Sequence, residues 1–372
     1  MISLSLVAAA RPNFMKIAPL IRAIVERSSK VSCRLIHTGQ HYDREMNGVF
    51  FDELGIPEPD IWLGCGGGSH ARQTAKIMVA FEQDLLANRP DWVVVVGDVN
   101  STLACSIVAR KLGVRVAHVE AGLRSGDRSM PEEINRLVTD SISDLFFVTE
   151  RAGLEHLRRE GKPESEVHYV GNVMIDNLFY QMDRLIHADT STFPSASLKA
   201  RLQESGRYAV ATLHRPSNVD DEVALRRSAS AIVAVAEHLP TVFPVHPRTR
   251  AKLDQYQIDL GARVHLSGPL SYMEFLNLWK DAALVITDSG GLQEETTGLG
   301  VPCVTMRENT ERPVTVEEGT NVIAGTDPAA VVTAVRSILD GHGKVGRRPR
   351  LWDGRASTRI VDVLVSAAEG EA

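Results

Sequence analysis

Short apolar runs alternate with longer amphipathic stretches along the first half of the chain. A run such as Val93–Val96 is apolar on both faces, which is typical of parallel strands covered by helices on each side. The predicted strands are Ser3–Ala8, Cys33–His37, Trp92–Val96, Val114–His118, Leu145–Thr149 and Val167–Val170. The predicted intervening helices include Phe14–Glu26, Arg72–Ala87, Thr102–Leu112 and Glu132–Ile142. This alternation predicts a doubly wound α/β domain.

The same pattern starts again in the second half. Before it lies Ala188–Ser197, a stretch of small and polar residues that includes Pro194 and is typical of a linker. The strands predicted after it are Tyr208–Leu213, Thr241–Val245, Val264–Leu266, Leu284–Thr287 and Cys303–Met306. We therefore expect two Rossmann-like doubly wound α/β domains, followed by a final helix over Ala356–Glu369.

Length and composition agree with two domains. The chain has 372 residues, too many for one ordinary core, with 44% hydrophobic and 24% charged residues. A net charge of -6 gives no global attraction to nucleic acid or an anionic membrane. No apolar run approaches the roughly 18 residues of a membrane helix, the four cysteines are scattered, and the start of the chain resembles a first strand. We expect a cytoplasmic protein with no membrane or nucleic-acid partner.

Polar residues collect where the predicted strands end. In open α/β sheets, ligands bind beyond the carboxyl ends of the strands. The residues at these positions are Arg11 and Lys16, Asp98, Glu120, His214, His246 and Asp288. Because both halves contribute, the sequence predicts a cleft between the two domains.

The segment Asp288–Glu295 combines the end of a strand, two glycines and the start of a helix. Free N–H groups and the helix dipole favour a diphosphate at Ser289, Gly290 and Gly291, and Glu294 or Glu295 one turn later suits ribose hydroxyls. An ordinary helix cap with a glycine turn is the alternative. The chain contains no P-loop motif, and no G-x-G-x-x-G follows the first strand, which argues against an NTPase and against a dinucleotide cofactor there.

Two cations begin the first helix, where the helix dipole does not favour them. Arg11 and Lys16 are therefore candidate ligands of a diphosphate, with ordinary surface charge as the alternative. The candidate acid–base groups are Asp98, Glu120, Glu132 and His214. Glu132 and Glu133 also have a structural interpretation, because acids stabilise the first turn of a helix.

Taken together, these motifs resemble the non-hydrolysing UDP-N-acetylglucosamine 2-epimerases over nearly the whole chain. The matching blocks are Ala10-Arg11-Pro12 with Lys16 and Ala18-Pro19, Thr38-Gly39-Gln40-His41, Gly97-Asp98, His118–Arg124, Pro131–Arg136, His214-Arg215, Asp288–Glu295 and Thr310–Pro313. Their order and spacing are highly specific.

The resemblance implies a GT-B-like fold in which the C-terminal helix returns to the first domain, and a homodimer. The implied domains are 1–175 plus 356–372, with the acid–base residues, and 176–355, which binds UDP. It implies no cofactor, neither metal nor nicotinamide. Matching catalytic positions are Asp98, Glu120, Glu132 and His214; matching UDP-binding positions are Arg11, Lys16, Ser289, Gly290, Glu295 and Arg312, to which we add Gly291.

The implied reaction eliminates UDP to leave 2-acetamidoglucal and re-adds it to give UDP-N-acetylmannosamine, an activated sugar for cell-surface polysaccharides. Alternatives are an epimerase of a related UDP-2-acetamido sugar, a hydrolysing epimerase, a GT-B glycosyltransferase and a non-catalytic UDP-sugar sensor. One departure concerns regulation. Pro216 and Ser217 stand where the family has Arg and Glu, which puts an activating second UDP-GlcNAc site in question.

Overall fold

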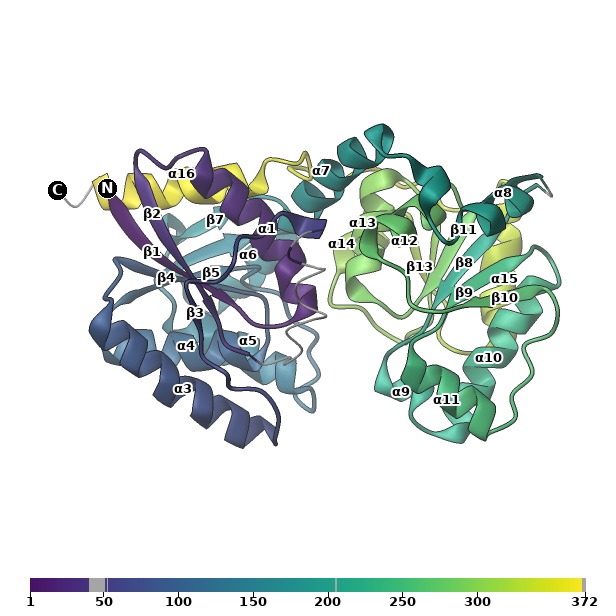
Figure 1. Cartoon of the computed structure of the whole chain (residues 1–372), viewed down its shortest axis with the longest axis horizontal. Coiled ribbons are helices and arrows are strands. Elements are labelled where there is room, and N and C mark those ends of the chain that lie inside the picture. Colours follow the sequence, from purple (N-terminus) through teal and green to yellow (C-terminus); the bar gives the residue numbers. More distant parts are fainter. Residues whose placement is uncertain (40–50, 52, 205, 370–372) are drawn as a thin grey trace. The chain divides into compact units, whose positions relative to one another are not determined.

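The computed structural model describes residues 1–39, 51, 53–204 and 206–369, without the side chains of residues 11, 12 and 369. It divides into two compact units, Met1–Asn177 with Arg350–Ala372 and Leu178–Pro349 (Figure 1). The first division falls inside helix α7 (Val173–His187), and the expected linker Ala188–Ser197 lies within the second unit. None of the helices in the described part of the chain is long and apolar enough to cross a membrane.

The first unit contains a seven-stranded sheet, all parallel, in the order β3-β2-β1-β4-β5-β6-β7. Its strands are β1 (Ile2–Ala8), β2 (Val31–His37), β3 (Ile61–Trp62), β4 (Trp92–Val96), β5 (Arg115–Val119), β6 (Leu145–Val148) and β7 (Val167–Tyr169). Its other helices are α1 (Arg11–Val25), α3 (His70–Ala87), α4 (Asn100–Lys111), α5 (Pro131–Ile142), α6 (Arg151–Arg159) and α16 (Ala356–Glu369). Val93–Val96 are buried on both faces, as predicted.

The C-terminal helix returns to the first unit, as the resemblance implied. Helix α16 packs against α1 (Figure 1). Asp176 accepts hydrogen bonds from the backbone N–H groups of Ala356 and Ser357, at 3.1 and 2.7 Å, and so caps the start of α16. The Trp352 indole donates to the carbonyl of Thr149 at 3.0 Å. These buried contacts anchor the returning segment.

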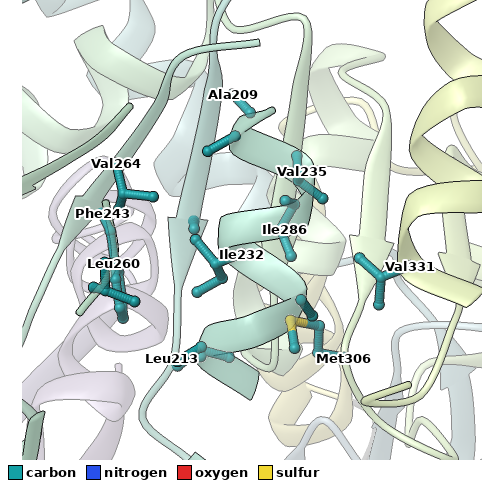
Figure 2. Close-up of a cluster of buried hydrophobic side chains, with 14 of the residues drawn as sticks. Ala209, Leu213, Ile232, Val235, Phe243, Leu260, Val264, Ile286, Met306 and Val331 are labelled. Atoms are coloured by element: carbon teal, nitrogen blue, oxygen red, sulfur yellow. The ribbon is translucent and has the colours of Figure 1, made fainter. Parts of the chain in front are cut away.

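The second unit contains a six-stranded parallel sheet in the order β10-β9-β8-β11-β12-β13. Its strands are β8 (Ala209–Thr212), β9 (Thr241–Pro244), β10 (Val264–Ser267), β11 (Leu284–Thr287), β12 (Cys303–Thr305) and β13 (Asn321–Ile323). Its helices are α8 (Ala196–Glu204), α9 (Pro216–Val219), α10 (Glu222–Ala236), α11 (Pro247–Gln255), α12 (Tyr272–Trp279), α13 (Gly290–Leu299), α14 (Pro313–Glu317) and α15 (Pro328–Leu339). Ile232 of α10 packs with Phe243, Ile286 and Val331 in its core (Figure 2).

Each sheet has one point where the strand order reverses, between β1 and β4 in the first unit and between β8 and β11 in the second. The crevice beyond the carboxyl ends of the strands at such a point is where doubly wound proteins bind ligands. Lys16 and Asp98 follow the two strands at the first reversal, and His214 and Ser289 follow those at the second. The topology thus places the residues predicted from the sequence at the ligand-binding edge of each sheet.

Candidate active site

In the first unit, Lys16 and Glu120 form a largely buried ion pair. Lys16 lies in the second turn of α1, and Glu120 directly follows β5. The Lys16 ammonium contacts Oε2 of Glu120, and the two side chains are 14% and 5% exposed. Removing either partner would leave the other charge poorly solvated and without a counterion. The ion pair therefore holds both side chains in place.

The backbone at Glu120 is strained. Its φ of 74° lies in the left-handed region, which costs a residue with a Cβ about 1–3 kcal/mol. The backbone N–H groups of Glu120 and Ala121 both donate to the carbonyl of Phe147, at 3.0 and 3.1 Å, and hold this turn. Gly97 leaves room for the pair, because a Cβ there would lie 3.4 Å from Nζ of Lys16. Strain of this kind is typical of functional positions.

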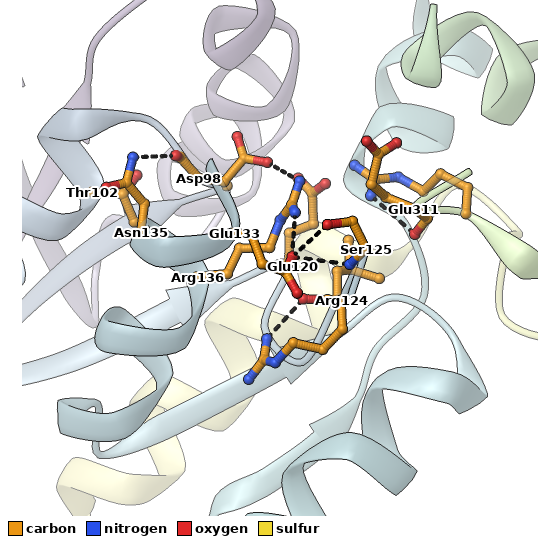
Figure 3. A network of polar contacts seen from close by, with 12 residues as sticks. Asp98, Thr102, Glu120, Arg124, Ser125, Glu133, Asn135, Arg136 and Glu311 are labelled. Carbon is orange, nitrogen blue, oxygen red and sulfur yellow. Dashed lines mark hydrogen bonds and ion pairs between the residues drawn. The ribbon is translucent and has the colours of Figure 1, made fainter. Parts of the chain in front are cut away.

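Arg136 connects two carboxylates beside this pair. Its guanidinium contacts Oδ2 of Asp98, after β4, and donates to Oε2 of Glu133 at 2.9 Å (Figure 3). Asn135, the neighbouring residue of α5, donates to the backbone carbonyl of Asp98 at 2.8 Å. Helix α5 therefore holds both the side chain and the backbone of Asp98.

Glu133 is bound more completely than its neighbour Glu132. Glu133 accepts hydrogen bonds from the N–H and hydroxyl of Ser125, at 2.9 and 3.0 Å, and from the N–H of Gly126 at 3.1 Å. Burial acts to raise the pKa of Glu133, but these bonds and Arg136 together hold it below its usual value. Glu132 is half-buried, and its side chain makes no hydrogen bond or ion pair with another described residue. The structure thus places Glu133 in the network and the predicted Glu132 outside it.

A second buried network connects the loops that follow β4 and β5. The sequence interpretation missed it. Nδ1 of His118 lies 2.6 Å from Asp140, and its Nε2 lies 2.9 Å from the carbonyl of Gly97. Asp140 also contacts Arg124 at 2.7 Å and accepts from the N–H of Gly122 at 3.0 Å. Burial acts to raise the pKa of Asp140, but His118 and Arg124 lower it below its usual value. The motif blocks Gly97-Asp98 and His118–Arg124 contained the partners of Asp140 but not Asp140 itself, and they did not indicate that these residues contact one another.

In the second unit, a histidine and an aspartate meet at the reversal point. His214 follows β8 and Asp288 follows β11. Nδ1 of His214 lies 3.0 Å from Oδ1 of Asp288; the His214 side chain is 55% exposed and that of Asp288 fully buried. The histidine ring is therefore largely exposed, while a buried carboxylate holds its Nδ1.

The next residues begin α13 and form a candidate anion site. The Ser289 hydroxyl accepts from the N–H of Leu292 at 3.5 Å. The first N–H groups of a helix have no intrahelical partner, so those of Gly290 and Gly291 can bind a phosphate. Arg215 lies beside them, with a guanidinium nitrogen 4.0 Å from the position that a Cβ on Gly290 would occupy. This half-buried turn matches the predicted diphosphate position.

Arginines and acids surround the same turn. Arg307 donates to both carboxylate oxygens of Glu311, at 2.8 and 2.7 Å, and Arg215 lies 3.8 Å from it. Burial acts to raise the pKa of Glu311, but Arg307, Arg312 and Arg215 lower it to about 2. The sequence interpretation did not name Arg307, and it included Arg215 and Glu311 only within the motif blocks His214-Arg215 and Thr310–Pro313, without a role.

The predicted residues Glu295 and Arg312 are both buried. Burial raises the pKa of Glu295 to about 7, against the effect of a hydrogen bond from Tyr272 and with a smaller contribution from Glu294. Arg312 donates to Glu294 at 2.7 Å, which directs its guanidinium. Glu295 is thus a carboxyl group that can both donate and accept near neutral pH.

Of the remaining predicted residues, Arg11 begins α1, but its side chain lies outside the described residues, as does the block Gln40-His41. Among the described residues, no group of three or more histidines, cysteines, aspartates and glutamates could hold a metal ion. The structure brings together Lys16, Asp98 and Glu120 on one unit. In the other unit, His214 and Ser289 follow β8 and β11, Gly290, Gly291 and Glu295 lie in the first two turns of α13, and Arg312 directly precedes α14.

Two Rossmann-like units define a GT-B-like α/β protein: the first has carboxylates held by cations at the ends of its strands, and the second has arginines beside the start of α13. A sequence profile of the UDP-N-acetylglucosamine 2-epimerases matches residues 23–365. The chain therefore belongs to the UDP-N-acetylglucosamine 2-epimerase family, and it is an isomerase by class.

Individual relatives agree over the full length. The UDP-N-acetylglucosamine 2-epimerase of Methanocaldococcus jannaschii is 39% identical over 367 residues, which are 97% of this chain and 98% of that protein. A UDP-2,3-diacetamido-2,3-dideoxy-D-glucuronate 2-epimerase of Pseudomonas aeruginosa is 38% identical over 95% of this chain and 97% of its own length. The crystal structure of the M. jannaschii UDP-GlcNAc 2-epimerase with UDP-GlcNAc and UDP has a TM-score of 0.86 and 37% identity, covering 98% and 99% of the two chains.

Proposed function

We propose that this enzyme interconverts UDP-GlcNAc and UDP-ManNAc by inverting carbon 2 of the sugar. The observation that carries the proposal is the pair of carboxylates Asp98 and Glu120, each held by a cation at the ligand-binding edge of the first sheet. Proton transfer to and from a carbon requires groups fixed in this way. The known substrate of the M. jannaschii relative supports the choice of sugar.

The proposed reaction has two balanced halves. A base removes the proton from carbon 2, the C1–O bond breaks, and its electron pair leaves with UDP as 2-acetamidoglucal forms. The β-phosphate oxygen then adds back to carbon 1, and a proton is delivered to the opposite face of carbon 2. Because UDP leaves as an anion, the site must stabilise negative charge on the diphosphate.

Each group of residues has a proposed task. Asp98, Glu120 and His214 transfer protons, together with Glu132 as the sequence predicted or Glu133 as the hydrogen-bond network favours. The N–H groups of Gly290 and Gly291, with Ser289, bind the diphosphate. Glu295 binds the ribose, and the cations Arg11, Lys16 and Arg312 complete the UDP site.

Incubation with UDP-GlcNAc alone in deuterium oxide, followed by proton NMR, tests the proposal. We expect deuterium at carbon 2 and formation of UDP-ManNAc without any acceptor sugar. UDP-GlcNAc with ¹⁸O between carbon 1 and the β-phosphorus should also scramble that oxygen into non-bridging positions, because the C1–O bond breaks. Free N-acetylmannosamine would indicate a hydrolysing enzyme instead. Absence of exchange on this and related UDP-sugars would rule epimerisation out.

A related UDP-2-acetamido sugar is the second candidate substrate. The Pseudomonas aeruginosa relative, named for a diacetamido-glucuronate, is about as similar to this chain as the UDP-GlcNAc epimerase of M. jannaschii. The ratio of kcat/KM on the two substrates decides between them. A preference for the diacetamido sugar would replace UDP-GlcNAc and leave the reaction at carbon 2 unchanged.

We also propose a homodimer that supplies an activated sugar for cell-surface polysaccharides, with weak or absent activation by a second UDP-GlcNAc. In support of the last point, Pro216 begins the short helix α9, where it occupies the position of the family's second arginine. The reverse reaction, started from pure UDP-ManNAc, should then proceed without a lag and without added UDP-GlcNAc. Sedimentation analysis tests the dimer.

A further inference from the structure

Asp288 is held on several sides by groups other than the His214 ring. Its carboxylate accepts from the backbone N–H of His214 at 3.1 Å and from that of Arg215 at 2.9 Å. The Asn218 side chain donates to it at 3.1 Å and also donates to the carbonyl of Met306 at 3.0 Å. Burial acts to raise the pKa of Asp288, but His214 and these N–H groups hold it below its usual value. Asp288 is therefore a fixed, ionised acceptor.

An ionised carboxylate only accepts hydrogen bonds, so a histidine nitrogen facing it must carry a proton. Nδ1 of His214 lies 3.0 Å from Oδ1 of Asp288. In the neutral ring, Nε2 is then the unprotonated nitrogen, and in the charged ring Nε2 is the nitrogen with a proton to give. The exposed side chain makes Nε2 the accessible atom.

We propose that Asp288 is a positioning residue, which holds His214 with Nδ1–H on the carboxylate and directs Nε2 at the reacting UDP-sugar. The role at the sugar rests on the proposed function, whereas the tautomer does not. Ser289 directly follows Asp288. The end of β11 therefore has two tasks: Asp288 orients the histidine, and Ser289 begins the proposed anion site. The proton-transferring atom would then have a fixed position relative to the bound diphosphate.

The tautomer of His214 can be measured in the full-length protein labelled with ¹⁵N-histidine. Long-range ¹H–¹⁵N correlation at a pH where the ring is neutral shows which nitrogen carries the proton, and the His214→Gln variant assigns the signals. We expect Nδ1 to be protonated, and addition of UDP to shift the Nε2 resonance. A wild-type ring protonated on Nε2, or an Nε2 resonance that does not respond to saturating UDP, would overturn the proposal.

Kinetics of the Asp288→Asn variant test the consequence. The amide replaces one acceptor oxygen with a donor facing the N–H groups, so the Nδ1–H tautomer should lose its preference. We expect kcat to fall about 100-fold and KM to change by less than about threefold, because binding groups are retained.

Thr212→Val is the matched control. It removes a hydroxyl pair with Thr287, at 2.8 Å on the same two strands, without touching the carboxylate, and should leave kcat within about threefold. Retention of wild-type kcat by Asp288→Asn would contradict the positioning role. If that variant does not fold, the wild-type spectrum still decides. The expected tautomer in a protein that exchanges no carbon-2 proton would contradict the proposed function and leave the tautomer assignment intact.

Discussion

The hydroxyl of Tyr272 donates a 2.7 Å hydrogen bond to Oε1 of Glu295, which is buried in the first turns of α13. Burial raises the pKa of this carboxyl group to about 7 although the Tyr272 bond lowers it. A glutamate proposed to bind ribose hydroxyls therefore changes its protonation near neutral pH. The stability of the fold therefore depends on pH in this range.

Glu295 should make the fold less stable as pH rises. Its pKa is 4.5 ordinarily and about 7 in the fold, so the folded chain binds more protons between these values. The free energy of unfolding falls by up to about 3 kcal/mol across this window and is constant above it. Glu295→Gln removes the effect, so its stability relative to wild type should increase from about pH 4 to about pH 8. Urea unfolding at several pH values measures this.

Two further variants make the experiment specific. Tyr272→Phe removes a bond that lowers the pKa of Glu295, so the upper end of the window should move to higher pH. Glu222→Gln removes an exposed carboxylate of α10 and controls for net charge. A stability difference between Glu295→Gln and wild type that does not vary with pH would contradict the raised pKa.

Glu311 should show the opposite trend. Its pKa is lowered from 4.5 to about 2, because Arg307, Arg312 and Arg215 outweigh burial. It contributes stability that is fully present above pH 4.5 and lost as pH falls toward about 2, with a magnitude of about 3 kcal/mol. Glu311→Gln should therefore destabilise the protein at neutral pH, and the deficit should shrink in acid. A deficit that stays constant down to about pH 3 would show that lost packing, not charge, causes it.

Much of the fold could be predicted from the sequence, because strands covered on both faces are continuous apolar runs such as Val93–Val96. The two-residue strand β3 (Ile61–Trp62) is too short to produce such a signal. The composition of Ala188–Ser197 predicted a linker there, whereas the division falls at Asn177, within α7, two residues from the boundary at 175 that the family resemblance implied. A continuous amphipathic helix passes from one unit to the other there, and helical periodicity does not reveal which core each turn joins.

The sequence predicted where most residues of the candidate site lie, but it predicted few of the contacts between them. Strand ends identified Asp98, Glu120 and His214, since parallel strands end at one edge of a sheet. Which of Glu132 and Glu133 faces inward depends on the rotation of α5 against the loop at Ser125, a tertiary relationship that sequence spacing does not contain. The left-handed backbone of Glu120 gave no signal either, because it depends on hydrogen bonds to a strand distant in sequence.

Glu132→Gln and Glu133→Gln separate the two adjacent acids. Glu133→Gln leaves the buried Arg136 without one of its carboxylates, so we expect a loss of about 3 kcal/mol in unfolding free energy and slower deuterium exchange at carbon 2. Glu132→Gln should change stability by less than about 0.5 kcal/mol, because its side chain is outside the network. If Glu132→Gln instead abolishes exchange at unchanged stability, Glu132 itself acts on the substrate.

The strain at Glu120 can be isolated by comparing two variants that both remove its carboxylate. In ordinary helices and strands, Ala is more stable than Gly by about 0.5–1 kcal/mol. At a φ of 74° the order should reverse, with Glu120→Gly more stable than Glu120→Ala by about 1 kcal/mol, because only glycine adopts this backbone without a Cβ clash. Glu155, an exposed position on α6, is the control site and should show the ordinary order. Both Glu120 variants should lose carbon-2 exchange. If Glu120→Ala equals or exceeds Glu120→Gly in stability, the turn after β5 is not strained, and the Lys16 ion pair alone would have to fix the carboxylate.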